Sequence, residues 1–403
     1  MKAIYAFGLL ILLAFLGSRF IVRHKSLSPL RYIFLSGLVY IFLGMYLGKM
    51  SLNILSTQVL DDLTPLLSLG LGWIGFLFGF QFERKYLRRF SKKYIGLSFL
   101  NFSLVFVLVS VAIFFLVREL YIEQPPYFLY GMVLAFGLLA TVNSPTLLNA
   151  ASFALPRKGD YCYLARFLAS ISGFWAILGL ALLFSYWHFP FFDSRIILKG
   201  SVTLASSTLV PILLGYLFHL LTKKRAQEQD IRVYLLGFVF FISGAAFYFN
   251  MPPLYVAMVM GITYSNLTKI QERLYPLLLS LEKPLYIVFL ILIGAIWEFK
   301  FDTRIALLIL VFLSSRILGY VLPMKSFRFL LRFPFPLPHL FGFTLLSFGG
   351  VGIAFAVSLK LAYAVELTDV FLSVSLISII VSDFISPWLL RISLLRLDCK
   401  ESL

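Results

Sequence analysis

Two charged residues stand inside otherwise apolar stretches of this sequence, where charge is expensive and by default indicates a function. Arg316 lies in Ser-Ser-Arg-Ile-Leu-Gly, and Asp383 lies in Ile-Val-Ser-Asp-Phe. A guanidinium can compensate exposed backbone carbonyls or a carboxylate, whereas a carboxylate can be neutralised by a cation or by a proton. Two interpretations of Arg316 stay open: this compensating role, and a long side chain that extends to water at the end of its stretch.

Two further stretches combine residues that break helices with polar groups. Proline removes an amide donor and biases the preceding residue away from helical geometry, and a cluster of glycines weakens a helix. Taken alone, each stretch is as typical of a structural feature, a proline kink or a close packing site between helices, as of a functional break in the helix. The residues concerned are Thr141, Asn143, Ser144, Pro145 and Thr146 in the first stretch, and Gly349, Gly350 and Gly352 in the second.

These residues lie in a chain that is far too apolar for a soluble enzyme. Of its 403 residues, 61% are hydrophobic and 13% are charged, whereas about a quarter of a soluble domain is charged. Most of the net charge of +17 lies in short loops between apolar stretches, which indicates cytoplasmic loops and excludes a nucleic-acid-binding protein. No nucleotide-binding or hydrolase motif is present, so we expect neither an enzyme nor a cofactor. Two cysteines and four scattered histidines predict no metal site.

The sequence predicts an all-α polytopic membrane protein of about thirteen transmembrane helices, since a helix needs roughly 20 apolar residues to cross a bilayer. We expect one transmembrane domain over residues 1–403, without a soluble regulatory domain. The alternation of basic loops predicts an inner-membrane protein with its N-terminus outside and its C-terminus in the cytoplasm. The predicted spans are 3–22, 32–49, 62–81, 94–117, 127–149, 161–185, 196–221, 232–249, 252–267, 284–298, 304–322, 340–361 and 369–391.

In this topology the two interrupted stretches belong to the fifth and twelfth spans, which run in opposite directions. Interrupted helices seven spans apart and opposed in direction are what an inverted repeat produces, and the two breaks then cross near the membrane midplane. Exposed peptide groups at such breaks, together with hydroxyl and amide side chains, can replace part of the hydration shell of an ion. We therefore expect the residues of both stretches to form an ion-binding crossover in a transporter.

Three stretches, in this order along the chain, make the sequence resemble the monovalent cation:proton antiporter superfamily, particularly its sodium/proton and potassium-efflux exchangers. Residues 63–93 are an apolar helix followed by a basic loop, residues 141–146 are similar to the unwound family motif, and residues 281–294 begin with an acidic residue and a proline. The resemblance implies exchange of sodium or potassium for protons by alternating access, in a homodimer within the lipid bilayer. It also assigns Arg316 to the basic residue that is usual in the eleventh span.

The sequence departs from this family at the sixth span, where the pattern has one or two aspartates that bind cation and proton. Ser172 and Gly173 stand at those positions, and neither side chain can titrate. One hypothesis is that Asp383, in the inverted-repeat counterpart of the sixth span, replaces the missing carboxylate; the other is a structural pair with Arg316. An alternative function is a non-transporting membrane sensor or assembly protein that retains the exchanger fold. A membrane enzyme for lipid-linked sugars is least supported, because the outer loops are short.

Overall fold

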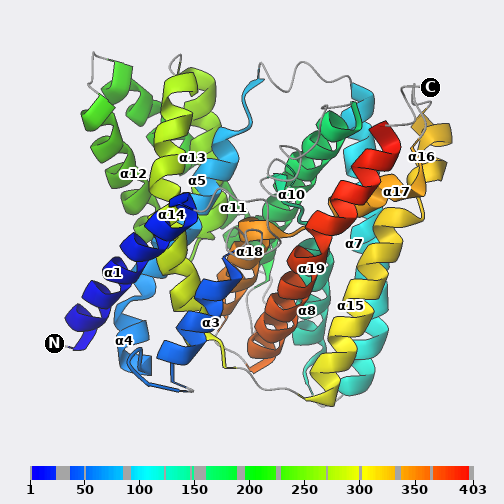
Figure 1. Cartoon of the computed structure of the whole chain (residues 1–403), viewed down its shortest axis with the longest axis horizontal. Coiled ribbons are helices and arrows are strands. Elements are labelled where there is room, and N and C mark those ends of the chain that lie inside the picture. Colours follow the sequence, from blue (N-terminus) through cyan, green and yellow to red (C-terminus); the bar gives the residue numbers. More distant parts are fainter. Residues whose placement is uncertain are drawn as a thin grey trace. The chain divides into compact units, whose positions relative to one another are not determined.

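The computed structural model contains helices and, in the residues that it describes, no strand (Figure 1). The contacts between Cα atoms divide the chain into two compact units, Met1–Leu87 with Phe184–Phe299 (unit 1) and Arg88–Leu183 with Lys300–Leu403 (unit 2). The described residues are 2–23, 37–49, 51–84, 92–121, 124–145, 148, 160–187, 196–223, 228–268, 271–298, 302–331, 337–363 and 366–398.

Each unit takes one segment from the first half of the chain and one from the second half. The first part of each half belongs to unit 1, and the second part of each half belongs to unit 2. A chain made of two structural repeats divides in this way, because equivalent parts of the repeats fold against each other. The division therefore supports the internal repeat that the two interrupted stretches predict.

Unit 1 is built around a pair of helices, α5 and α13, whose backbones approach closely. The carbonyl oxygens of Leu254 and Met258 on α13 would lie 2.2 and 2.1 Å from a Cβ atom at Gly75 and Gly79 of α5. Small residues four apart permit such an approach in a membrane, where van der Waals packing holds helices together. The helices of unit 1 are α1 (Lys2–Arg23), α3 (Leu38–Leu47), α4 (Thr57–Asp62), α5 (Thr64–Phe80), α11 (Ile196–Lys223), α12 (Glu228–Tyr248), α13 (Pro253–Leu267) and α14 (Gln271–Ile296).

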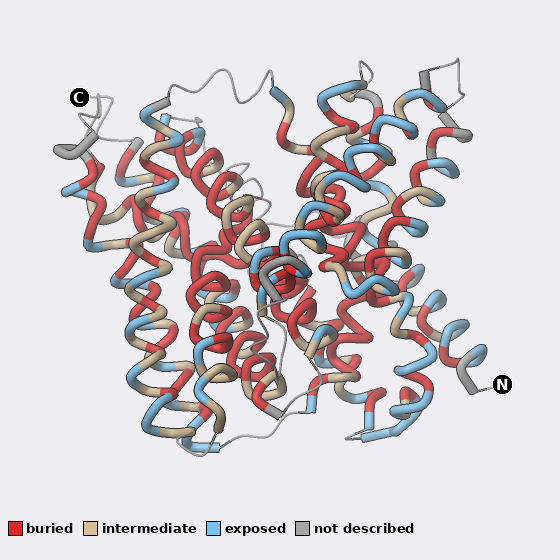
Figure 2. Tube along the Cα trace, turned by 180° about the vertical axis from the view of Figure 1, so that it is seen from behind, coloured by how far each residue is buried: buried red, intermediate tan, exposed pale blue. Residues whose placement is uncertain are grey.

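Unit 2 surrounds two interrupted helical segments with longer continuous helices. Helices α7 and α15 run side by side on its outside, and Figure 2 shows exposed residues along them, whereas buried residues dominate the inner helices. The helices of unit 2 are α7 (Lys92–Leu120), α8 (Pro126–Ala140), α10 (Asp160–Tyr186, which runs into unit 1), α15 (Thr303–Val321), α16 (Met324–Leu331), α17 (His339–Gly342), the 3₁₀ helix η1 (Phe343–Leu345), α18 (Gly349–Ala362) and α19 (Glu366–Asp398).

All thirteen predicted spans contain helix, and the helix of the tenth extends well beyond its predicted start. The tenth span was expected to begin at residue 284, whereas α14 begins at Gln271 and contains Pro276 and Pro284 in its interior. The leucine-rich residues before Pro284 continue the apolar surface, and membrane helices tolerate an interior proline when neighbours satisfy the freed backbone group. Among the described residues, six helices are long and apolar enough to cross a membrane, or seven if η1 with α17 and α18 form one bent span. The count of thirteen stays a prediction.

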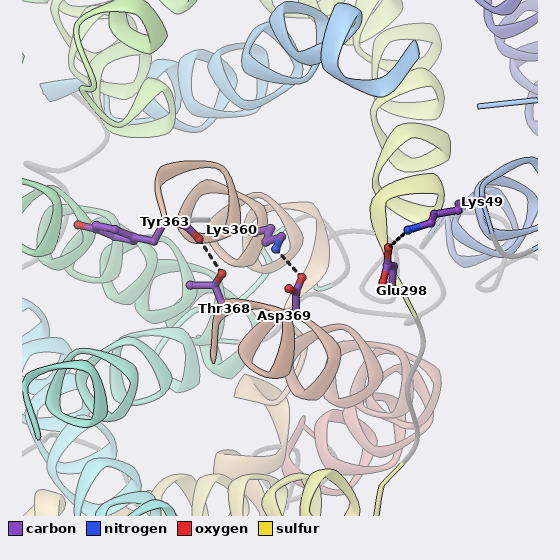
Figure 3. Close-up of polar contacts among 6 residues, drawn as sticks. All are labelled: Lys49, Glu298, Lys360, Tyr363, Thr368 and Asp369. Atoms are coloured by element: carbon purple, nitrogen blue, oxygen red, sulfur yellow. Dashed lines mark hydrogen bonds and ion pairs between the residues drawn. The ribbon is translucent and has the colours of Figure 1, made fainter. Parts of the chain in front are cut away.

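Ion pairs and a hydrogen bond fix helix ends within each unit (Figure 3). In unit 1, Lys49 Nζ lies 3.1 Å from Glu298 Oε1 and joins the ends of α3 and α14. In unit 2, Lys360 of α18 pairs with Asp369 of α19, and Thr368 Oγ1 donates to the carbonyl of Tyr363 at 2.6 Å. These contacts join the end of α18 to the start of α19. Exposed pairs of this kind contribute at most about 1 kcal/mol each.

We predict that Gly79→Ala destabilises the protein by about 1–3 kcal/mol, because the added methyl group overlaps the backbone of α13 and forces the helices apart. Thermal unfolding of the purified protein in detergent, followed by circular dichroism, measures the effect. The matched control is Gly244→Ala on α12, where a Cβ atom would meet nothing within 4 Å. Equal unfolding temperatures for the two variants would contradict the packing.

Candidate functional site

The first interrupted stretch begins where α8 ends, at Ala140. Thr141 closes the helix: its Oγ1 donates to the carbonyl of Leu138 at 2.7 Å, and residues 142–144 are not helical. Val142, Asn143 and Ser144 are buried even though their peptide groups lie outside a helix. Backbone of this kind inside a membrane protein must be satisfied by protein or water, so the surrounding helices have to supply its partners.

The second interrupted stretch separates η1 from α18, and the helical segments on its two sides are bent by 60°. Leu346, Ser347 and Phe348 form the break, and α18 starts at Gly349. Gly349 has a φ of +60°, in the left-handed region that costs a residue with a side chain about 1–2 kcal/mol. The glycine therefore permits the chain to change direction at the start of α18.

The two breaks cross in direct contact within unit 2. The amide of Ser144 in the first break donates to the carbonyl of Ser347 in the second break at 2.8 Å. A Cβ atom at Gly349 would lie 2.3 Å from Ser144 Oγ, so only glycine fits at this position. The expectation of two crossing broken helices is confirmed.

The guanidinium of Arg316, on α15, binds the first break. Its Nε donates to the carbonyl of Ala140 at 2.8 Å, and its Nη2 donates to the carbonyl of Val142 at 2.9 Å and to Asn143 Oδ1 at 3.2 Å. The carbonyl of Ala140 is among those that the end of α8 leaves without a partner in the helix, and the carbonyl of Val142 lies in the break itself. The positive charge also faces the negative end of the α8 dipole.

The same guanidinium binds the second break. Its Nη1 donates to the carbonyl of Leu346 at 2.6 Å and to Ser382 Oγ at 3.3 Å, so every N–H group of the side chain has an acceptor. The ring of Phe348 lies against it, with 3.5 Å from Arg316 Cζ to the ring centroid. Arg316 is 1% exposed. The guanidinium therefore joins the two breaks, and the interpretation that it extends to water is wrong.

Asn143 connects this charge to the sixth predicted span. Its Nδ2 donates to Ser172 Oγ on α10 and to the hydroxyl of Tyr320 on α15, both at 2.9 Å. Ser172 Oγ in turn donates to the carbonyl of Leu168 at 2.7 Å. Ser172, one of the two positions at which the resemblance expects an aspartate, thus lies beside the crossing and supplies a neutral hydroxyl.

Asp383, on α19, binds the opposite side of the second break. Its two carboxylate oxygens accept from the amides of Phe348 and Gly349 at 2.7 and 2.9 Å. A carboxylate is favourable there, because the first amides of a helix have no partner within it and carry partial positive charge. The two ion pairs in the described part of the chain lie elsewhere, so the predicted direct pair with Arg316 is not formed. Arg316 instead binds the carbonyl of the first residue of the break, and Asp383 binds the amides of its last residue and of the first residue of α18.

The other predicted site residues surround the crossing without direct polar contacts to it. Gly173 is buried in α10, Pro145 is buried after the first break, and Gly350 is half-buried in the first turn of α18. A Cβ atom at Gly352 would lie 2.8 Å from Phe348 Cβ, so that glycine serves packing. Thr146 lies outside the described residues.

Sequence reasoning missed Tyr320, Ser382 and Phe348. Tyr320 follows Arg316 by four residues, so both side chains lie on one face of α15, and this spacing could have indicated it. Ser382 precedes Asp383 and donates to the carbonyl of Leu346 at 2.6 Å. No sequence pattern distinguishes Phe348 from the many other phenylalanines of the chain.

We predict that Arg316→Lys lowers the thermal stability of the protein strongly. Lysine has three donors on one nitrogen and cannot reach the acceptors of both breaks, and each buried carbonyl that loses its partner costs about 1–3 kcal/mol. The control is Arg304→Lys at the exposed start of the same helix, which should unfold as the unchanged protein does. A stable Arg316→Lys variant would show that the guanidinium does not hold the crossing together.

Comparisons with known proteins agree with this geometry. The sequence matches the family described as "Sodium/hydrogen exchanger, transmembrane" over residues 9–392. No curated protein sequence matches the chain. Two solved structures of the sodium proton antiporter MjNhaP1 from Methanocaldococcus jannaschii have a similar fold. One has a TM-score of 0.66 at 16% identity and covers 98% of this chain and 99% of the antiporter; the other has a TM-score of 0.68 at 15% identity and covers 98% and 97%. The chain is therefore a multi-pass membrane protein that belongs to the sodium/hydrogen exchanger family.

Proposed function

We propose that the protein is a secondary active transporter that exchanges a monovalent cation for protons by alternating access. The observation that carries the proposal is the crossing of two interrupted helices, where the amide of Ser144 binds the carbonyl of Ser347. Peptide groups freed from helical bonding can coordinate an ion in place of water, and inverted repeats place such groups near the middle of the membrane. Family membership supports the same function.

We propose that the cation binds at the crossing, next to the polar network of unit 2. The oxygens of Thr141, Asn143, Ser144 and Ser172 gather there on α8, its break and α10. Asn143 Oδ1 accepts a hydrogen bond from Arg316, and Ser172 Oγ accepts one from Asn143. Cation binding therefore requires that Asn143 release these hydrogen bonds. The fixed charge of Arg316 lies on the other side of Asn143 and favours release of the cation.

Sodium is the cargo that we favour over potassium, because the antiporter with a similar fold is named for sodium. We further propose a homodimer in the inner membrane, with the N-terminus outside and the C-terminus in the cytoplasm. The basic loops of the sequence support this orientation, and the family resemblance supports the dimer. The single transmembrane domain over residues 1–403 remains part of this proposal.

We predict that the protein, reconstituted in vesicles with an internal pH dye, changes the internal pH when a gradient of sodium, potassium or lithium is imposed. Gly349→Ala should lower the rate at least about tenfold. Strain at positive φ and overlap with Ser144 would each destabilise the crossing, together by more than about 1 kcal/mol. Gly244→Ala, where a Cβ atom meets nothing within 4 Å, is the control for the substitution.

The two possible outcomes separate the proposed function from its alternative. An ion-dependent dye response that Gly349→Ala abolishes and Gly244→Ala leaves intact supports exchange through the crossing. A well-folded, reconstituted protein that gives no response with any of the three ions over a broad pH range would refute the proposal. That result would favour a non-transporting sensor or assembly protein with the exchanger fold.

A further inference from the structure

Exchange of a cation for a proton requires a group that binds either one, and the crossing lacks a carboxylate at the sixth-span position. Ser172 and Gly173 stand there on α10. Arg316 and Asp383 are the charged residues of the buried part of the described chain, at 1% and 2% exposure. Asp383 is therefore the buried carboxylate, among the described residues of unit 2, that could bind a proton.

The bonds of Asp383 connect it to the part of the crossing that must move. Its oxygens hold the amides of Phe348 and Gly349, which are the last residue of the break and the first residue of α18. Ser144 of the other break touches the same position, since a Cβ atom at Gly349 would lie 2.3 Å from its Oγ. A change at this carboxylate therefore acts on both breaks at once.

Buried hydroxyls on the same helix lead to Asp383. The Oγ atoms of Ser375, Ser378 and Ser386 are buried and have no hydrogen-bond partner among the described residues, and Ser347 Oγ at the crossing has none either. With Ser382, the serines of α19 recur at spacings of three and four residues and so share one face of the helix. Buried hydroxyls without a protein partner are satisfied by water.

The place of this serine face in unit 2 follows from its neighbours. Phe371, one turn before Ser375, contacts Phe136 of α8 with ring centroids 4.7 Å apart. Ser382, one turn after Ser378, receives a hydrogen bond from Arg316. The face therefore runs along α8 toward the crossing, and water bonded to its hydroxyls would reach the residues around Asp383.

The charged group that faces Asp383 is the guanidinium of Arg316 on α15, which donates to Ser382, the residue before Asp383. The phenol of Tyr320 lies one turn after Arg316 on the same helix. The titratable groups that α8, α17 and α18 carry lie at helix ends or have partners: Tyr127 and Tyr130 on α8, His339 bonded to the carbonyl of Val321, and Lys360 paired with Asp369. Among these described groups Asp383 is the buried carboxylate, and its hydrogen-bond partners are two backbone amides.

We propose that Asp383 is the proton-binding carboxylate of this exchanger, in place of the absent sixth-span aspartate, and that the serine face of α19 conducts the proton to it through bound water. The proposal rests on the proposed function. A proton taken from this water binds one oxygen of Asp383, which loses its negative charge, becomes a hydrogen-bond donor and accepts only weakly from the amide that it held. The start of α18 loses its counter-charge, and loss of the proton to water on the other side restores the carboxylate and both bonds.

The test compares Asp383→Asn with Asp369→Asn, the same substitution at an exposed site on the same helix. In sodium-loaded vesicles with the pH dye, Asp383→Asn should lower proton movement at least tenfold, whereas Asp369→Asn should leave it unchanged. Adding Ser172→Asp to Asp383→Asn, which restores a carboxylate beside Asn143, should recover proton movement. A size-exclusion profile establishes that each variant is folded.

A second measurement does not depend on any variant folding. Infrared difference spectra of the unchanged protein, with ¹³C-labelled aspartate carboxyl groups, should show a label-sensitive carboxylic acid band that appears within the pH range of transport. Exposed aspartates titrate near pH ~4 and give no such band in that range. The absence of this band would overturn the proposal, even if Asp383→Asn fails to fold.

The outcomes distinguish this proposal from the proposed function. If the unchanged protein exchanges ions and folded Asp383→Asn does so at the same rate and with the same pH dependence, Asp383 does not carry the proton, although exchange stands. If the unchanged protein exchanges no ion, the proposed function fails. The infrared band then decides alone whether Asp383 binds a proton.

Discussion

One guanidinium satisfies the backbone of both interrupted helices. Arg316 donates to Ala140 and Val142 in the first stretch and to Leu346 in the second, and these carbonyls have no partner in their own helices. In a membrane the cost of an unpaired peptide group and the cost of a buried charge are both several kcal/mol. Each cost is offset by the other group, so neither the breaks nor the arginine would be stable alone.

The two buried charges among the described residues of unit 2 bind different peptide groups: one binds carbonyls and the other binds amides. Arg316 binds carbonyls at the end of α8 and at the first residue of the second break, and Asp383 binds the amides of Phe348 and Gly349 at the start of α18. Each charge thus faces the helix end of opposite sign. Because the two side chains act through the break instead of pairing, the carboxylate keeps a role that a permanent ion pair would prevent. This arrangement supports the proposal that Asp383 acts in place of the aspartate that the family resemblance leads one to expect at Ser172 or Gly173.

The sequence was sufficient to predict the helical class and both breaks, because apolar length, Pro145 and the glycines from Gly349 act locally. It also indicated that Arg316 and Asp383 matter, since intramembrane charge is rare. Their partners depend on how α15 and α19 pack against the breaks, and no local pattern records such tertiary contacts. The structural pair of Arg316 with Asp383 was wrong for this reason: the sequence identifies both residues as intramembrane charges, but it does not say which groups lie between them. The start of α14 was missed because interior prolines are tolerated in membranes.

A high-resolution cryo-electron microscopy map of the protein in a lipid nanodisc tests the central claim most directly. The account predicts density for the Arg316 guanidinium within hydrogen-bond distance of the carbonyls of both breaks, with residues 142–144 and 346–348 unwound and in contact. A map in which both stretches are continuous helices, with Arg316 directed to the membrane surface, would contradict the account.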